Sequence, residues 1–415
     1  MFPIDILQYI VSYMNEFQDV MSWRHTCRRT FITYTVSFYC SRMYTFIRTP
    51  YVLITKDTNL DRLSKRTYIN GLVVNSTNKP LGNKHLCNLK NLFSLKISTS
   101  YPYSSIDAKA FKNFNKLKAF ICSRETFVND EVLMYMPDLI YLDCTACLHV
   151  TGKSLGSLHH LTTLICEDIY DLDFRFLTNL TNLKSLTIHQ SVQNDINIFK
   201  SLTNLTTLNL SPSMSIKPEI VKLLPNLDSV ICGNYEYTDD HLMHLNNLKM
   251  LICGINCFFT SLSISRLQNL TVLNINNGVF NITDSALINL TNLLELHCGI
   301  LYIPDYIFKY YTELRILNCD SNILMSDTAL EYLPKLISLN CGKNLKFTDI
   351  GLSKLHKLRY LNCGINRNFR EELFKISKRL NVLEITIHSQ AVVSKEFDNV
   401  IKRIKKHMPI RHRYE

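Results

Sequence analysis

A segment of about 22 residues recurs along most of the chain, and this repeat limits the possible folds more than any other feature. Its pattern is Leu-x-x-Leu-x-x-Leu-x-Cys/Ile/Leu, and fourteen in-phase copies begin between Leu89 and Ser377 of the 415 residues. A weaker copy over residues 66–74 extends the array by one step. Because one unit of this length cannot bury its apolar side alone, neighbouring units must stack into a solenoid.

Each copy predicts one short strand and one short helix. Segments such as "LNC" have the two-residue alternation of a strand. The stretches "MSDTALEYLPKL" (325–336) and "FTDIGLSKLHKL" (347–358) place Leu at helical spacing and open with a Ser/Thr-Asp pair that can cap a helix. We therefore expect an α/β repeat solenoid over residues 66–390, a horseshoe with a concave parallel sheet and short helices or 3₁₀ turns outside.

The repeat resembles the leucine-rich-repeat family, in its class with a period near 22 residues. The family signature Leu-x-x-Leu-x-Leu-x-x-Asn/Cys stands here as "LRYLNCGIN" (358–366), "LISLNCGKN" (336–344) and "LRILNCDSN" (314–322). The resemblance implies a horseshoe that binds other proteins. We expect a basic C-terminal cap or tail over residues 391–415 to follow the solenoid.

Nine of the fourteen cysteines occupy one slot of the repeat, where other copies carry Ile or Leu. Exchange between Cys and aliphatic residues indicates a buried apolar position, because a free thiol behaves there as a small hydrophobic group. The sequence therefore predicts core cysteines, without catalysis, metal or cofactor. These cysteines are Cys122, Cys144, Cys166, Cys232, Cys253, Cys298, Cys319, Cys341 and Cys363.

Zinc is the alternative that the spacing allows. Cys144 and Cys147 stand three residues apart, as do His241 and His244, and the histidine pair lies between Cys232 and Cys253. Cys147 however fills the turn slot that Asn holds in other copies, and His241 fills a helical slot. Inward cysteines and outward histidines should lie on opposite sides of a coil, which argues against zinc. No nucleophile motif, phosphate loop or dinucleotide fingerprint is found, so we expect no enzyme.

Composition narrows the possible partners. The formal net charge of +11 is concentrated at the two ends of the chain, which argues against a continuous nucleic-acid groove. The first residues lack the features of a secretory signal, and no apolar run reaches the length of a membrane span. We expect a soluble protein with no membrane or nucleic-acid partner, in the cytoplasm or nucleus, or inside a host cell if the source is viral.

Strand side chains between the apolar positions should line the concave surface and contact a protein partner. They form an apolar patch and then an Asn-rich row, whose other interpretation is a structural ladder of mutually hydrogen-bonded amides. We expect exposed Ile and Met in the patch to mark a partner surface. The predicted partner-binding residues are Ile165, Ile231, Met250, Ile252, Val272, Asn274, His297, Asn318, Asn340, Tyr360 and Asn362.

The N-terminal segment does not follow the repeat. "FPIDILQYIVSYMNEFQDVMSWRHTCRRTF" resembles the F-box motif, although the closing Trp is absent. The resemblance implies a small helical domain over residues 1–45, joined by residues 46–65 to the solenoid, that binds an Skp-type adaptor. The residues implied to bind the adaptor are Phe2, Pro3, Ile6, Leu7, Ile10, Val11, Tyr13 and Met14.

Two functions follow from these patterns. An F-box domain before leucine-rich repeats implies the substrate-recruiting subunit of a cullin-RING ubiquitin ligase, in which the repeats select the target and other subunits catalyse. The alternative is a repeat scaffold without a ubiquitin role, in which the amphipathic first helix only seals the first coil.

Overall fold

The computed structural model describes most of the chain from Tyr51 onward. The described residues are 51–54, 71–74, 81–97, 106–169, 172–188, 196–210, 217–233, 236–276, 281–299, 301–320, 322–342, 344–364, 366, 368–369, 371–387, 395–406, 408 and 410–414. The F-box-like segment, residues 1–45, lies outside them. The chain divides into unit 1, Met1–Leu180, and unit 2, Thr181–Glu415, and each is described by itself.

Unit 1 alternates short strands with single-turn helices. Its strands pair in parallel and in sequence order from β1 to β6. The described elements are β1 (Tyr51–Ile54), β2 (Gly71–Val74), α4 (Asn83–Leu86), β3 (Ser94–Ile97), η3 (Ala108–Phe111), β4 (Ala119–Ile121), α5 (Asp130–Met134), β5 (Tyr141–Asp143), α6 (Gly152–Leu155), β6 (Thr163–Cys166) and η4 (Phe174–Asn179).

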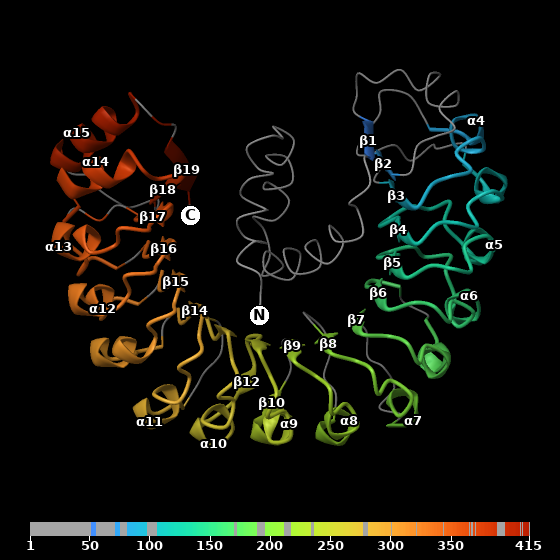
Figure 1. Cartoon of the computed structure of the whole chain (residues 1–415), viewed down its shortest axis with the longest axis horizontal. Helices are drawn as coiled ribbons and strands as arrows, with labels where there is room; N and C mark the ends of the chain where they lie inside the picture. Colours follow the sequence, from blue (N-terminus) through green and yellow to red (C-terminus); the bar gives the residue numbers. More distant parts are fainter. Residues whose placement is uncertain are drawn as a thin grey trace. The chain divides into compact units, whose positions relative to one another are not determined.

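Unit 2 continues the same alternation, with its strands on one side and its helices on the other (Figure 1). The described elements are β7 (Ser185–Ile188), α7 (Ile196–Phe199), β8 (Thr207–Asn209), α8 (Pro218–Lys222), β9 (Ser229–Ile231), β10 (Tyr237–Thr238), α9 (Asp239–Leu242), β11 (Met250–Ile252), β12 (Cys257–Phe258), α10 (Ser261–Ile264), β13 (Val272–Asn274), α11 (Asp284–Leu287), β14 (Glu295–His297), η5 (Asp305–Tyr310), β15 (Ile316–Asn318), α12 (Asp327–Glu331), β16 (Ser338–Asn340), α13 (Asp349–Ser353), β17 (Tyr360–Asn362), α14 (Glu371–Ser377), β18 (Val382–Ile387), α15 (Lys395–Ile404) and β19 (Ile410–Tyr414).

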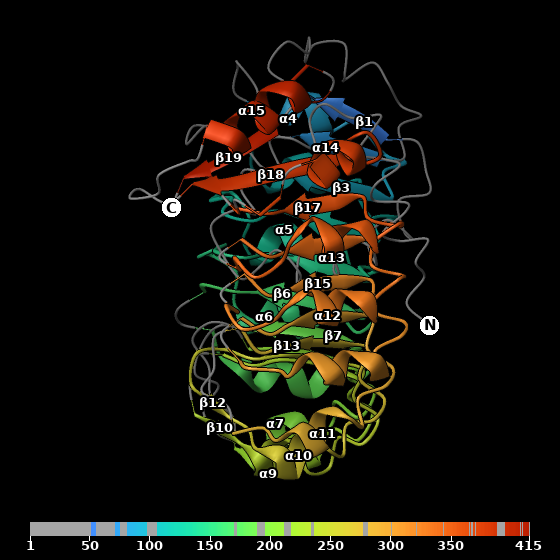
Figure 2. The same ribbon diagram turned by 90° about the vertical axis from the view of Figure 1, so that its left-hand side faces the viewer.

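The main sheet of unit 2 is parallel, and its strands from β13 to β18 stack in sequence order (Figure 2). The middle residue of each short strand enters the core, as Leu296, Leu317, Leu339 and Leu361 do with no exposed surface. The flanking leucines of each copy are buried as well, so the repeat pattern is the pattern of the core. The predicted repeat solenoid with a parallel sheet is confirmed.

The parallel sheet of each unit extends past the limit suggested by the repeat pattern. Strand β1 lies within residues 46–65, expected to be a connecting segment, and pairs in parallel with β2. At the other end β19 pairs in parallel with β18, within the expected cap or tail. Helix α15 covers the last coil and buries Val400, Ile401 and Ile404. These added strands pair with the outer backbone groups of β2 and of β18.

The nine cysteines of the repeat slot are buried, as predicted. Five of them donate the thiol to a carbonyl oxygen of the next coil: Cys122, Cys144, Cys298, Cys319 and Cys341. The Sγ atom of Cys341 donates to the carbonyl oxygen of Asn362 at 3.4 Å, and that of Cys319 to Asn340 at 3.5 Å. The backbone N–H of the same cysteine donates to the same carbonyl. Cys thus fills an aliphatic slot and adds a weak hydrogen bond between coils, which explains its recurrence.

The turns after the strands are held by buried asparagines. The Oδ1 atom of Asn344 accepts hydrogen bonds from the backbone N–H groups of Lys346 and Phe347, at 2.8 and 3.3 Å. Its Nδ2 atom donates to the carbonyl oxygen of Met325 in the preceding coil, at 3.0 Å. Asn322 and Asn366 make the same kinds of contact. One side chain therefore satisfies a loop that has no regular backbone pairing.

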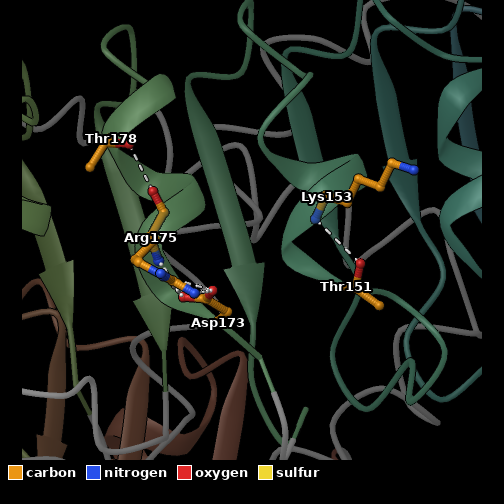
Figure 3. Close-up of polar contacts among 5 residues, drawn as sticks. All are labelled: Thr151, Lys153, Asp173, Arg175 and Thr178. Atoms are coloured by element: carbon orange, nitrogen blue, oxygen red, sulfur yellow. Dashed lines mark hydrogen bonds and ion pairs between the residues drawn. The ribbon is translucent and has the colours of Figure 1, made fainter.

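Several short helices are capped by hydroxyl and carboxylate side chains, among them the predicted Ser326 and Thr348. Figure 3 shows two caps in unit 1: Thr151 Oγ1 accepts from the N–H of Lys153 at 3.3 Å, and Asp173 Oδ1 accepts from the N–H of Arg175 at 3.0 Å. The Arg175 guanidinium also lies 2.6 Å from Asp173 Oδ2. These contacts satisfy amides that a helix of one turn cannot pair internally.

An aspartate at the start of many helices also bonds the next coil, which the sequence patterns did not predict. Asp239 accepts from both the backbone N–H and the hydroxyl of Thr260, at 2.8 and 2.6 Å. In the four pairs that join such an aspartate to a Ser or Thr the two residues are 21 positions apart, so this contact repeats with the coil. The other pairs are Asp130–Thr151, Asp305–Ser326 and Asp327–Thr348.

Candidate functional site

The partner-binding residues predicted from the sequence lie on the side of each sheet that faces away from the core, here called the sheet face. In each strand the middle side chain enters the core, so the first and third side chains point to the sheet face. Strand pairing aligns them into a first row and a third row. In β15 and β16, Ile316 pairs with Ser338 in the first row and Asn318 with Asn340 in the third.

All eleven predicted residues occupy these two rows, and their role as contacts stays a prediction. Ile165 lies on β6 of unit 1, and the other ten lie on neighbouring strands of unit 2. In unit 2 the first row holds Met250, Val272 and Tyr360, and the third row holds Ile231, Ile252, Asn274, His297, Asn318, Asn340 and Asn362.

The apolar part of this set is not exposed, contrary to our expectation. Ile231 and Ile252 are each 1% exposed, and Met250 and Val272 are buried too. Parallel pairing sets Ile231 beside Ile252 and Met250 beside Val272, about 4.8 Å apart, so the side chains of a row cover one another. The prediction of an exposed patch at these four residues is wrong, and their burial contributes to stability.

Ile165 has a similar structural role in unit 1. It packs in a cluster with Ala119 and Tyr141, and Ile121 packs against the same cluster. These residues come from three neighbouring strands, β4, β5 and β6. The sheet face of unit 1 therefore carries a small apolar core of its own.

The third-row asparagines have a fixed orientation. The Oδ1 atoms of Asn318 and Asn340 accept hydrogen bonds from the backbone N–H two residues further on, at 3.2 and 3.4 Å. Asn274 and Asn362 make the same contact at 3.1 and 3.2 Å. Their oxygens therefore serve the turn within one coil, rather than the amides of neighbouring coils. Because each oxygen faces the turn, the amide NH₂ group presents its hydrogen atoms to the other side.

Asp143 shows what this slot requires. It occupies the third row in unit 1, and its Oδ1 atom accepts from the backbone N–H of Thr145 at 3.1 Å. A carboxylate satisfies the same turn that an amide satisfies at Asn318. The turn thus depends on the oxygen alone, and the NH₂ groups of Asn318 and Asn340 are not needed for it.

The carboxylates of this part of the sheet face are already engaged. The Nε2 atom of His297 lies 2.7 Å from Glu295 Oε1, with His297 buried. At the other end the hydroxyl of Tyr360 donates to Glu384 Oε2 at 3.2 Å. Between these two pairs Asn318 and Asn340 are half-buried. Strands β15 and β16 therefore offer hydrogen-bond donors, without an uncommitted carboxylate beside them among the paired residues of these rows.

A row of hydroxyl groups on the sheet face was missed by the sequence patterns we considered. Ser185, Thr207 and Ser229 hold the first position of β7, β8 and β9, and strand pairing places them side by side. Each is buried, and its oxygen has no hydrogen-bond partner within the described structure. Leaving a buried hydroxyl unpaired costs about 1–3 kcal/mol, so this row lowers the stability of the fold. The signal was Ser, Thr and Ser in one slot of three successive copies.

The alternative zinc site has no support from the arrangement of side chains. Among the residues that the structure describes, no group of three or more His, Cys, Asp or Glu has the geometry to hold a metal ion. Cys147 Sγ lies 3.0 Å from the carbonyl oxygen of Cys122 and 3.9 Å from its Sγ atom. Cys147 thus donates to the preceding coil as the turn asparagines do. Burial raises the pKa of the Cys122 thiol, which opposes its ionisation to a metal-binding thiolate.

His241 does not point outward, as we had expected. It is buried, its Nδ1 atom accepts from the backbone N–H of Thr238 at 3.1 Å, and its ring lies 5.0 Å from that of Tyr237. The third position of these one-turn helices faces the core, where Ala286 and Ala329 are also buried. The small residues in this slot were a signal of burial that the zinc argument overlooked.

Comparison with solved structures identifies proteins of similar fold. No protein-family profile and no curated protein sequence matches the chain. Among solved structures, an internalin of Listeria monocytogenes is similar, with a TM-score of 0.51 and 22% identity over 73% of this chain and 88% of its own. A leucine-rich-repeat protein of Leptospira interrogans is similar with a TM-score of 0.53 and 20% identity, over 87% of this chain and 99% of its own. The fold is that of a leucine-rich-repeat solenoid.

The leucine-rich-repeat solenoid is also similar to a chain of the yeast Rad7 and Elc1 complex, with a TM-score of 0.48 and 15% identity over 94% of this chain and 96% of that one. Sequence identities of 15–22% to these solved structures indicate a shared fold and nothing about function. In the described part of the solenoid, every helix is too short or too polar to cross a membrane.

Proposed function

We propose that the sheet face of unit 2 binds a protein partner, with β14 to β17 as the contact region. The observation that carries the proposal is the fixed orientation of Asn318 and Asn340, whose NH₂ groups are not needed by their own turns. Both are half-buried, so a partner can reach them without unfolding a coil. Ile316, Ser338 and Tyr360 lie beside them in the first row and are half-buried too. A strip of donors next to mixed apolar and polar groups suits a polypeptide surface.

The finer form of the proposal is an F-box subunit of a cullin-RING ubiquitin ligase. Its support is the resemblance of residues 2–29 to the F-box motif, followed by a leucine-rich-repeat solenoid. In this arrangement the N-terminal segment binds an Skp-type adaptor and the sheet face binds the target. The chain would raise the effective concentration of the target near the catalytic subunits. The alternative keeps the sheet-face contact and has no adaptor.

The sheet-face contact is tested by turning donors into acceptors. Asn318→Asp with Asn340→Asp keeps the oxygen that each turn needs, as Asp143 does in unit 1, and replaces each NH₂ group by an oxygen. Asn247→Asp with Gln268→Glu adds the same charge at exposed positions of the helix side. Partners captured from cell extract by the wild type are quantified by mass spectrometry against both variants.

We expect the wild type and the helix-side variant to capture at least one partner in equal amounts. The sheet-face variant should capture about tenfold less of that partner, because it loses one hydrogen bond at each of the two sites. Thermal unfolding should be similar for all three proteins. Equal capture by the two variants would remove the sheet face from the proposal.

The adaptor proposal has its own test. A purified Skp-type adaptor is titrated against the full chain and against Pro3→Ala with Leu7→Asp, and circular dichroism checks that the variant keeps its secondary structure. Saturable binding that the variant loses supports the F-box assignment. Absence of binding to the wild type, or equal binding by the variant, leaves the scaffold without a ubiquitin role. This result does not depend on the sheet-face variants.

A further inference from the structure

A strip of exposed apolar side chains runs along one edge of unit 2, outside the sheet face. It consists of Tyr302, Ile323, Leu324 and Leu345, here called the edge strip, and each member is between 47% and 62% exposed. These residues follow the strands β14, β15 and β16, so they belong to three successive coils. Side chains of this size and exposure, gathered on neighbouring coils, are typical of an interaction surface.

The loops that carry the edge strip are stacked and held in place. Asn322 Nδ2 donates to the carbonyl oxygen of Leu301 at 2.8 Å, and Asn344 Nδ2 to that of Met325 at 3.0 Å. Lys346 Nζ lies 3.4 Å from the carbonyl oxygen of Leu324. The edge strip is thus displayed on ordered backbone, and a partner would bind it at little cost in conformational entropy.

The dimensions of the edge strip suit a helix. Adjacent coils are about 4.8 Å apart, so two steps from Tyr302 to Leu345 span about 10 Å. Residues i and i+7 of an α-helix are about 10.5 Å apart and lie on the same face. An amphipathic helix with apolar residues at i, i+3 or i+4, and i+7 can therefore place one side chain at each coil.

A lysine beside the edge strip favours a partner helix that carries acidic residues. Lys346 is exposed beside Leu345 and, within the described residues, its ammonium group has no carboxylate partner. A carboxylate on the polar side of a bound helix can reach it. An acidic partner is favoured by this local positive charge.

We propose that the edge strip binds an acidic amphipathic helix of a partner protein. The apolar side of that helix packs on Ile323, Leu324 and Leu345, with Tyr302 at one end, and a carboxylate of the helix pairs with Lys346. This surface is separate from the third-row asparagines. It goes beyond the proposed sheet-face contact and can hold or fail without it.

The test uses a synthetic helical probe and the full chain. The probe is a fluorescein-labelled peptide of about 14 residues with leucines on one helical face and glutamates elsewhere, and a peptide of the same composition with the leucines scattered is the control. Fluorescence anisotropy measures binding to the wild type, to Ile323→Glu with Leu345→Glu, and to Leu262→Glu with Ile350→Glu. The last pair is 58% and 64% exposed on the helix side and controls for added charge.

We expect saturable binding of the probe, reduced about tenfold or more by the edge-strip variant and less than about twofold by the helix-side variant, since each apolar side chain removed from a contact weakens it substantially. The Lys346→Glu variant should bind the acidic probe more weakly than the wild type does. It should bind more tightly a probe in which one glutamate is replaced by lysine. Asn318→Asp with Asn340→Asp should leave probe binding within about twofold, which separates this result from the sheet-face proposal.

Four outcomes would overturn the proposal. The first is an equal loss of probe binding in the edge-strip and helix-side variants, and the second is equal binding of the scattered peptide. The third is binding to phosphatidylcholine vesicles, without binding to the probe, that the edge-strip variant abolishes. The fourth is a dimer, seen by light scattering, that the edge-strip variant dissociates. The last two would assign the edge strip to a lipid surface or to a second copy of the chain.

Discussion

Replacing Asn344 by alanine should destabilise the coil around β16 more than any surface change nearby. The side chain has no exposed surface and makes three hydrogen bonds, one to the carbonyl oxygen of Met325 and two from the N–H groups of Lys346 and Phe347. Alanine removes all three and offers nothing in their place. The loop has no other backbone pairing that could absorb the loss.

The expected magnitude follows from the groups left unpaired. A buried polar group without a partner costs about 1–3 kcal/mol. The carbonyl of Met325 and the N–H of Phe347 belong to buried residues, whereas Lys346 is exposed and water can reach its N–H. Counting two groups, Asn344→Ala should lower the free energy of unfolding of this region by about 2–6 kcal/mol.

A second substitution at the same site checks the reasoning. Cys147 occupies the equivalent turn in unit 1 and donates its thiol to the carbonyl oxygen of Cys122 at 3.0 Å. Asn344→Cys keeps one donor that can reach the preceding coil, as the Cys147 thiol does, and should therefore cost about 1–2 kcal/mol less than Asn344→Ala. Asn340→Ala serves as a comparison and should cost less than Asn344→Ala, because Asn340 is half-buried and alanine removes one contact at 3.4 Å in place of three.

Hydrogen exchange measured by mass spectrometry gives the local free energy of opening for peptides that span β16 to α13. A local measurement is needed because a stacked array does not always unfold in one step. A decrease of less than about 1 kcal/mol in the opening free energy of Asn344→Ala would contradict this prediction. An equal decrease in the cysteine and alanine variants would contradict it as well.

Three further predictions concern thiols, backbone and pH. Burial raises the pKa of Cys363 to about 12, so iodoacetamide at pH 8 should label it at least tenfold more slowly than half-buried Cys87, and urea should remove the difference. Gly364 has φ +53°, and an added Cβ would lie 1.9 Å from a carbonyl oxygen of the neighbouring coil, so Gly364→Ala should cost about 2–4 kcal/mol in denaturant unfolding. Burial alone would raise the pKa of Asp239, but hydrogen bonds including those from Thr260 outweigh it and lower that pKa. The ionised form therefore stabilises the fold at pH values above the unfolded pKa of about 4. The loss of thermal stability in Asp239→Asn should be largest near pH 7 and should fade as the pH falls below about 4.

The fold was predictable because its determinants repeat. Each leucine of the pattern has the same environment in every coil, so fourteen copies report on one structural position. The cysteine slot was readable for the same reason, since Ile and Leu replace Cys in it. Strands β1 and β19 lie outside the pattern and were missed, because pairing at the ends of an array depends on contacts rather than on a period.

The candidate site was only partly predictable. Alternation placed Asn318 and Asn340 on the sheet face, but it could not show that their oxygens bond the next turn. It also could not show that Ile231 is covered, since burial depends on what neighbouring strands contribute. The hydroxyl row from Ser185 to Ser229 was visible only after strand pairing aligned the three residues. Side-chain partners in three dimensions decided each of these cases.

The aspartate that starts a helix and bonds the next coil has a consequence for how such a chain can change in length. Asp305 bonds Ser326, and Asp327 bonds Thr348, each 21 positions ahead. Deletion of residues 306–327 would bring Thr348 to that same distance from Asp305, whereas a deletion one residue shorter or longer would not. Loss or duplication of this one 22-residue copy therefore leaves Asp305 with a hydroxyl partner. This stretch of the array can lengthen or shorten in steps of one coil, with the new junction already hydrogen-bonded.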